Sequence, residues 1–184
     1  MTKLQFRGAI AAVALLAAGP AMSAAKNPMV GGAAMYPTKT IVENAVNSKD
    51  HTTLVAAVKA AGLVETLSGP GPFTVFAPTD AAFAKLPAGT VDTLVKPENK
   101  DQLTNILTYH VVAGTMTSKQ IAAAIKAGDG KATLTTVQGE PLTASMMGKT
   151  LMLTDAKGGT SHVTIGDVMQ SNGVIHVVNA VLMP

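Results

Sequence analysis

The side chains of this sequence best suited to metal binding or acid–base chemistry are its four histidines and ten methionines. His51, His110, His162 and His176 stand at spacings that match no common zinc pattern. His110 and His176 lie among valines and isoleucines, which favours buried imidazoles bonded to backbone or hydroxyl groups. His162 is compatible with a sheet surface. The histidine pattern therefore predicts no zinc site.

Three methionines near one another raise a second metal hypothesis. Thioethers are ligands for soft copper ions, so Met146, Met147 and Met152 could form a copper site outside the cytoplasm. The alternative is that methionine fills the core, because aromatic residues make up only 3% of the chain and tryptophan is absent. We favour the core interpretation and expect no metal and no cofactor.

Nucleophilic chemistry has little support in the sequence. The chain has no cysteine, which excludes a disulfide, a thiolate metal site and a cysteine nucleophile. No G-x-S-x-G motif is present. A hydrolase would require the fold to bring His110 or His176 beside a serine and an aspartate in an open cleft. Asp80 is the best-placed carboxylate, but no second acid is near it in sequence, so we expect no enzyme.

The segment around Asp80 predicts a strand that changes directly into a helix. Residues 74–76 are strand formers, and Pro78 ends the strand because it cannot donate to a sheet ladder. Thr79 is placed to cap the helix, and Asp80 lies in its first turn, where the helix dipole favours negative charge. Pro78 and Phe83 hold the two positions of a hydrophobic staple.

Helical periodicity marks the first half of the chain and short strands mark the second. We expect helices over 41–46, from 50 to 61 with Gly62 as a left-handed C-cap, and over 90–109 with a division at Pro97. Thr117 and Gln120 form a capping box for a further helix that stops at Gly128. Evenly spaced short strands from Lys131 onward indicate antiparallel meanders. The fold class is therefore α+β.

Three strings resemble the signatures of one protein family. They are GPFTVFAPTDAAFAKLP at 71–87, LTNILTYHVV at 103–112 and SNGVIHVVNAVLMP at 171–184. Together and in this order they are similar to the fasciclin (FAS1) domain, over residues 36–184. The resemblance implies a β-wedge or sandwich of short, mostly antiparallel strands flanked by several α-helices. It also implies an exported protein of cell adhesion or matrix contact, and Thr79, Asp80, Tyr109 and His110 become candidate partner-binding residues.

One position departs from the family pattern. The family commonly has an acidic residue where this chain has Asn179. If that acid makes a charge-assisted hydrogen bond, Asn179 makes a weaker neutral one.

The N-terminus has the features of an export signal. Lys3 and Arg7 precede an apolar run at 9–18, and small residues follow at 21–25. The run is too short to span a bilayer, and a buried N-terminal helix is the alternative. We expect a signal peptide over 1–25, a flexible leader over 26–35 and a single domain over 36–184. No later segment reads as a membrane span, so the expected location is secreted or periplasmic.

Charge and composition limit the expected partners. Removing residues 1–25 takes away Lys3 and Arg7, which leaves 12 lysines against 11 acidic residues and no arginine. A chain without arginine or a basic cluster is a poor nucleic-acid binder. We expect a monomer that contacts a cell-surface or matrix protein or a polysaccharide. The alternative is a binder of a small hydrophobic ligand in a groove of the methionine- and alanine-rich core.

Overall fold

A single seven-stranded sheet organises the protein. The structure, a computed structural model, describes residues 28–184. The strands follow the order β4-β3-β9-β8-β7-β6-β5, and all neighbours are antiparallel except β3 and β9, which are parallel. Their bounds are β3 (Phe73–Pro78), β4 (Val111–Ala113), β5 (Lys131–Thr135), β6 (Pro141–Met147), β7 (Thr150–Thr154), β8 (Thr160–Gln170) and β9 (Gly173–Val178).

The two ends of the sheet meet and fold it into a wedge. Val112 of β4 forms an isolated bridge with Thr136, just after β5. The amide of Val137 also donates to the carbonyl of Val111 at 2.7 Å. These contacts give the sheet an inner and an outer face over β5–β8, in agreement with the β-wedge that the fasciclin resemblance implies.

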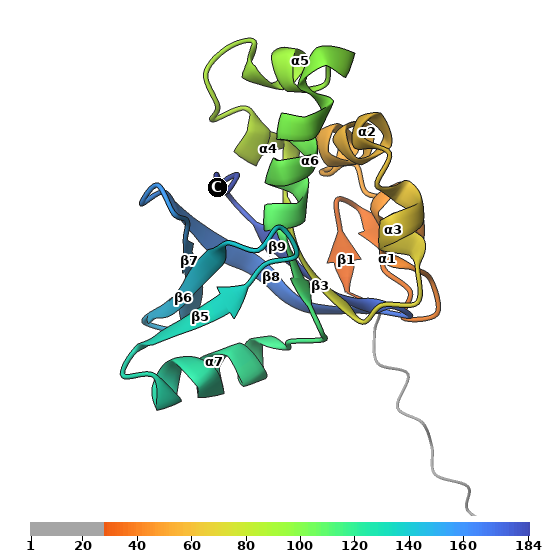
Figure 1. The fold of residues 1–184 in the computed structure, drawn as a ribbon. Helices are drawn as coiled ribbons and strands as arrows, with labels where there is room; N and C mark the ends of the chain where they lie inside the picture. Colours follow the sequence, from red (N-terminus) through yellow and green to blue (C-terminus); the bar gives the residue numbers. More distant parts are fainter. Residues whose placement is uncertain (1–27) are drawn as a thin grey trace, which may run out of the picture.

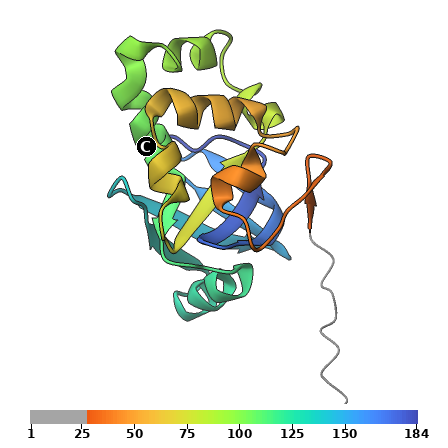
Figure 2. The same ribbon diagram turned by 90° about the vertical axis from the view of Figure 1, so that its right-hand side faces the viewer.

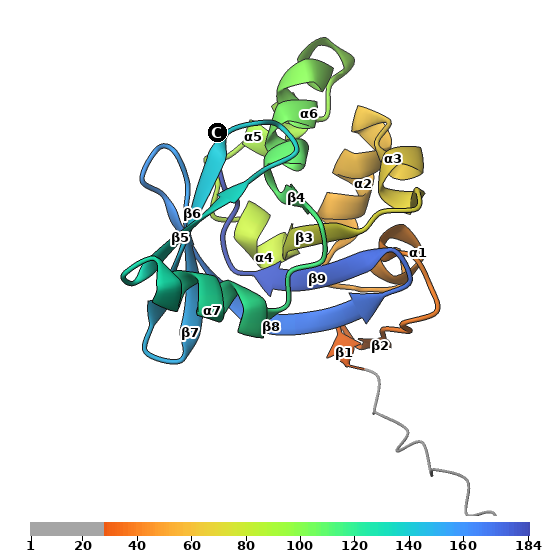
Figure 3. The ribbon, with the colours of Figure 1, turned by 60° about the horizontal axis from the view of Figure 1, so that its bottom comes forward.

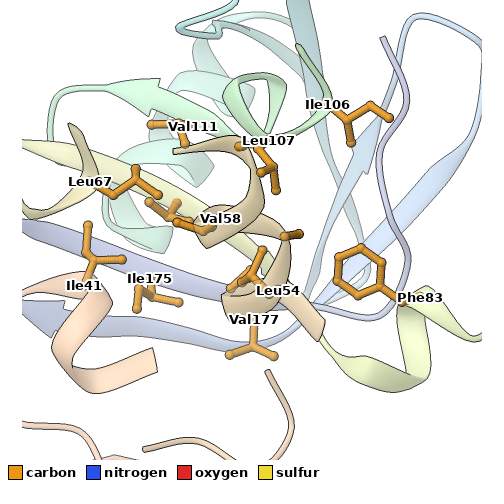
Figure 4. Packing of buried hydrophobic residues seen from close by; sticks show 14 of the residues in the cluster. Ile41, Leu54, Val58, Leu67, Phe83, Ile106, Leu107, Val111, Ile175 and Val177 are labelled. Carbon is orange, nitrogen blue, oxygen red and sulfur yellow. The ribbon is translucent and has the colours of Figure 1, made fainter. Parts of the chain in front are cut away.

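Short helices cover the sheet at β3 and β9 (Figures 1 and 2). Their side chains meet those of both strands in one hydrophobic core, and Figure 4 shows helix residues such as Ile41, Leu54 and Val58 packed near Ile175 and Val177 of β9. The helices are α1 (Ile41–Ala45), α2 (Thr52–Ala61), α3 (Val64–Ser68), α4 (Asp80–Phe83), α5 (Thr90–Leu94) and α6 (Lys100–Tyr109), with a 3-10 turn, η1, at Pro97–Asn99.

A second core fills the inside of the wedge. Helix α7 (Ser118–Ala127) lies beside β5 and β6 (Figure 3) and contributes Ile121 and Ile125. These side chains pack with Phe76 of β3 and with the inward-facing leucines Leu134, Leu142 and Leu153 of β5, β6 and β7. α7 therefore covers the inner face of this part of the sheet.

Most element boundaries agree with the sequence expectation for physical reasons. The capping box of Thr117 and Gln120 is formed, and Gly62 adopts a φ of 72° at the C-cap of α2. Pro97 begins η1 and so separates α5 from α6. The approach to β3, expected as turns, instead contains α3, because Val64 and Leu67 pack into the first core. The α+β class is confirmed.

The N-terminal part of the described chain differs from the flexible leader expected over 26–35. β1 (Met29–Val30) and β2 (Ala33–Ala34) pair as a hairpin. Val30 and Met35 are buried in the first core, which attaches the hairpin to the domain. The expected signal peptide over 1–25 lies outside the described residues. Within residues 28–184, no helix has the length and apolar character needed to cross a membrane.

Candidate functional site

Asp80 caps a helix other than its own. The cap position of α2 is His51, whose side chain makes no capping hydrogen bond. The Asp80 carboxylate takes over this function, accepting hydrogen bonds from the amide of Thr53 at 2.8 Å and from the hydroxyl of Thr52 at 2.6 Å. A carboxylate at a helix N-terminus satisfies free amides and complements the helix dipole. Asp80 therefore joins α4 to α2.

The environment of Asp80 keeps it ionised. Partial burial by itself would raise the pKa of this carboxyl, but the hydrogen bonds from Thr52 and Thr53 outweigh it and the pKa is lowered. Thr79 caps α4 through its hydroxyl, which accepts from the amide of Ala82 at 3.2 Å. Thr79 and Asp80 are half-buried and, with Lys49, line an open hollow of about 270 Å³.

Tyr109 and His110 are enclosed in the molecule. Tyr109 is 0% exposed, and its hydroxyl donates to the carbonyl of Pro141 and accepts from the amide of Ala156, both at 3.1 Å. His110 is 2% exposed. Its Nδ1 lies 2.8 Å from the carbonyl of Ile106, and its Nε2 accepts from the amide of Leu182 at 3.0 Å. The Tyr-His pair therefore ties β6, α6 and the C-terminal segment together.

Burial sets the protonation state of His110. Desolvation lowers the pKa of its imidazole to about 4, so the ring is neutral at physiological pH. A neutral ring with one N–H matches the two observed partners, one acceptor and one donor. The expectation of a buried, backbone-bonded histidine is confirmed. The partner-binding role of Thr79, Asp80, Tyr109 and His110 stays a prediction.

His176 has serine and aspartate neighbours, but they form no nucleophile–base pair. The Ser118 hydroxyl donates to the carboxylate of Asp167, not to the imidazole. The Nε2 of His176 lies 2.8 Å from the carbonyl of Met116, and its Nδ1 accepts from the amide of Asp167 at 3.3 Å. A serine nucleophile needs its base within hydrogen-bond reach and an open approach, and His176 is fully buried.

Asp167 repeats the structural role of Asp80. Its carboxylate accepts from the amide of Ser118 at 2.6 Å, at the first residue of α7. A side chain of β8 therefore caps α7 from a distance of 49 residues in sequence. Both aspartates cap the start of a helix that is distant in sequence, Asp80 from α4 and Asp167 from β8.

Asn172 gives the third signature string a structural role. Its Oδ1 accepts from the amide of Ile41 at 3.0 Å, and its Nδ2 donates to the carbonyls of Leu67 and Gly69 at 2.7 and 2.9 Å. The side chain thus holds α1 and the end of α3 against the β8–β9 turn. Asn179 makes the neutral hydrogen bond expected of it, accepting from the amide of His162 at 2.9 Å.

The outer face of β5–β8 carries a different set of side chains. Thr133, Thr143, Thr154 and Thr160 are register partners on four successive strands. A second row, beside the first, consists of Lys131, Ser145, Met152 and His162. Neighbouring strands lie about 4.8 Å apart, so each row is a regular line of side chains. We call these eight residues the outer face; all are exposed or half-buried.

The outer face is not evident from the sequence alone. The strands expected over 133–137, 142–147, 151–154 and 162–165 are all present with shifted ends. The alternation of threonine with leucine or alanine in TLT and TAS was a usable signal that one side of each strand faces water. The register cannot be read from the sequence, because only the pairing of the strands shows that the four threonines stand in one line.

The fold and these sites define a class of small α+β domains in which the charged and aromatic signature residues build the frame. A model of the fasciclin domain matches residues 49–184. The chain belongs to the fasciclin-domain family.

Relatives span nearly the whole chain. Protein sll1483 of Synechocystis is 48% identical over 161 residues, which cover 86% of this chain and 81% of that protein. The immunogenic protein MPB70 of Mycobacterium bovis is 38% identical over 179 residues, covering 92% of this chain and 82% of that protein. The FAS1 domain pair of the insect cell adhesion molecule Fasciclin I superposes with a TM-score of 0.69 at 18% identity, over 79% of this chain and 51% of that one. This last similarity concerns the fold.

Proposed function

We propose that this protein is a secreted or periplasmic, non-enzymatic interaction module that attaches to a cell-surface or matrix component. Its family membership supports this proposal, since a protein of the same fold is named a cell adhesion molecule. The histidines best placed for catalysis, His110 and His176, are both committed to backbone partners. The protein acts as a monomer in this proposal.

The observation that carries the proposal is the uncovered outer face. In Figure 1, β5–β7 form the left-hand edge of the molecule, and the labelled helices lie to the right of these strands or below them. α7 packs on the inner face, through Ile121 and Ile125. This sheet surface has no covering layer in the described part of the chain, so it is accessible to a partner.

The chemistry of the outer face favours an uncharged, hydroxyl-rich partner. Four threonines form one of its rows, and Lys131 is its one lysine. Threonine presents a methyl group and a hydroxyl that both donates and accepts, which matches the apolar and polar faces of a sugar ring or of a β-structured protein surface. Weak contacts repeated along a row add up by multivalency on a polymer.

Retention on envelope material tests this proposal. Purified protein is passed over immobilised polysaccharide and protein fractions of the host envelope, beside the variant Thr143→Lys/Thr154→Lys. We expect the parent protein to be retained and the double variant to be released, because two charges interrupt the threonine row. Thr93→Lys, an exposed threonine on α5, is the matched control and should be retained. Equal retention of the parent and the double variant would contradict the role of the outer face.

Two of the four candidate partner-binding residues, Thr79 and Asp80, are tested in the same assay. Thr79→Val and Asp80→Asn change side chains beside the open hollow without adding bulk. If these residues contact the partner, retention falls while the melting temperature changes little. If they act only within the frame, the loss of retention follows the loss of stability.

A second function, binding of a small hydrophobic ligand, has one specific observation in its favour. A cavity of about 40 Å³ lies between α1, α2, α3 and β3 and is lined mainly by aliphatic side chains such as Ile41, Leu54 and Val58. Ligand pockets are usually about 300–1,000 Å³, so a ligand would need α2 and α3 to separate from β3. Native mass spectrometry of protein from its own host tests this function: a co-purifying mass supports it, and a clean apo mass contradicts it.

A further inference from the structure

We propose that His162, Met152 and Met147 form a surface site for a soft monovalent metal ion, copper(I) or silver(I). This inference goes beyond the proposed adhesion function and concerns the same outer face, to which Met152 and His162 belong. Methionine was expected to fill the core. Met35 fits this expectation at 2% exposure, but Met147 is 56% exposed and contradicts it.

The strand register brings the three ligands together. Met152 of β7 is the direct register partner of His162 on β8. Met147 of β6 pairs with Thr150, so it stands diagonal to Met152 on the same face. Direct partners have Cβ atoms about 4.5–5.5 Å apart and diagonal neighbours about 7–8 Å apart, within reach of long side chains. Two thioethers and one imidazole therefore lie on one face of three adjacent strands, with Met152 between Met147 and His162.

The same register removes Met146 from the group. Met146 pairs with Leu151, whose side chain is buried in the second core, so Met146 points to the opposite face from Met147. Met146 instead borders a hollow beside Ser118 and Lys119 of α7. The cluster expected from sequence proximity is thus replaced by one that includes His162.

His162 is the histidine of the outer face, and no side-chain hydrogen bond within residues 28–184 holds its ring. His51, His110 and His176 each have a side-chain hydrogen bond, although the Nε2 of His51 is also enclosed without a partner in this part of the chain. The Nδ1 of His162 is enclosed and has no partner. Its backbone is held on both sides by Asn179, whose Oδ1 accepts from the His162 amide at 2.9 Å and whose amide donates to the His162 carbonyl at 3.1 Å. These two hydrogen bonds therefore hold the backbone of His162, from which the imidazole projects.

The donor set selects the metal. Thioether sulfur and imidazole nitrogen suit copper(I), whereas calcium and magnesium require several oxygen ligands. In the described part of the chain, no group of three histidine, cysteine or acidic side chains could hold a metal ion. Lys131 lies in the same row as Met152, two strands away, and repels a divalent cation more strongly than a monovalent one.

Methyl NMR with silver(I) tests the site on the unmodified protein. Silver(I) is a redox-stable stand-in for copper(I), and the methionine methyl groups report sulfur coordination directly. We expect one equivalent of silver nitrate to shift the methyl signals of Met147 and Met152. The signals of Met29 and Met169, two exposed methionines elsewhere, should stay in place. Equal shifts at all exposed methionines, or no shift at Met147 and Met152, would overturn the proposal.

Copper(I) affinity supplies the second test. Competition with bicinchoninate under anaerobic, reducing conditions is measured for the parent, Met152→Leu, His162→Gln and Met147→Leu. Each variant should lose at least the roughly tenfold in affinity that the loss of an outer-shell partner costs a metal site. Met146→Leu is the matched control, adjacent in sequence but on the opposite face, and should bind like the parent. Unchanged affinity in Met152→Leu and His162→Gln, or an equal loss in Met146→Leu, would overturn the site.

Discussion

The two halves of the sheet use similar side chains for opposite purposes. Where helices cover β3 and β9, polar groups such as Asn172 and His110 are enclosed and bonded to the backbone. Over β5–β8 no helix within residues 28–184 covers the outer face, and the threonines there, with Met152 and His162, stand in rows at the surface. The covered half, β3 and β9 with their helices, holds the fold together and forms its frame. The open half, β5–β8, presents its side chains at the surface.

This difference shows where family signatures and function separate. The signature residues Asp80, His110 and Asn172 lie in the covered half, and each holds together segments that are far apart in sequence. The outer face lies between the second and third signature strings. Residues that identify the family thus build its frame, and the proposed binding surface belongs to the part of the chain outside these strings.

Acid should affect the covered half most strongly. The pKa of His110 is about 4 in the folded protein against 6.5 for an ordinary histidine, because burial disfavours the charged ring. Above pH 6.5 both states are neutral, and between pH 6.5 and 4 the unfolded state binds the extra proton. The free energy of unfolding should therefore fall by about 3 kcal/mol over this range.

Two more histidines also lower the free energy of unfolding as the pH falls. Burial also lowers the pKa of His51 and of His176, so both add to the loss on acidification. Urea unfolding at pH 7 and at pH 4.5 measures the total. Equal free energies of unfolding at the two pH values would show that these rings are not enclosed as described.

Removal of Asn172 should have the next largest effect. Asn172→Ala deletes three hydrogen bonds and leaves the amide of Ile41 and the carbonyls of Leu67 and Gly69 without partners. Each such loss costs about 1 kcal/mol, so we expect a destabilisation of about 3 kcal/mol in denaturant unfolding. Asn179→Ala removes a half-buried asparagine near the open half, and it should lower the free energy of unfolding less than Asn172→Ala does. A larger destabilisation by Asn179→Ala than by Asn172→Ala would contradict the distinction between the covered and the open half.

Loss of the Asp80 cap should cost an intermediate amount. Asp80→Ala leaves the N-terminus of α2 without a side-chain cap, since His51 provides none. We expect a loss of about 1–2 kcal/mol in thermal or denaturant unfolding, as for other helix caps. Hydrogen exchange should accelerate first at the start of α2. Unchanged exchange there would mean that another group satisfies these amides.

Substitution on the outer face should scarcely change stability. Thr143→Val keeps the shape and β-propensity of the side chain and removes one half-buried hydroxyl, so the free energy of unfolding should stay within about 0.5 kcal/mol of the parent. The same variant should weaken retention on envelope material, so this result would separate binding by the open half from stabilisation by the covered half. A loss larger than that of Asp80→Ala would show that the outer face belongs to the frame.

Local chemistry explains which parts of the fold the sequence could predict. Pro97, Gly62 and the pair Thr117–Gln120 act on their own neighbours, and the boundaries they predict are present. The caps made by Asp80 and Asp167 could not be predicted, because each spans at least 27 residues. The parallel pairing of β3 with β9 could not be predicted for the same reason, since no local signal pairs two strands that are 100 residues apart.

The candidate site depends even more on distant pairing. The sequence raised Met146, Met147 and Met152 together as soft ligands and favoured a core role for them, whereas strand alternation places Met146 on the other face and the register sets His162 beside Met152. Burial of the Tyr-His pair also depends on the C-terminal segment, whose Leu182 amide reaches His110. Both outcomes follow from tertiary contacts.

Oxidative footprinting of the two most comparable methionines tests the central claim most directly. Met147, on the open half, is 56% exposed, and Met29, on the N-terminal hairpin, is 57% exposed. Their oxidation rates are measured by mass spectrometry in metal-free protein, first alone and then bound to the envelope fraction that retains it. We predict that binding slows the oxidation of Met147 and leaves that of Met29 unchanged. Slower oxidation of Met29 with no change at Met147 would contradict the assignment of the open half as the binding surface.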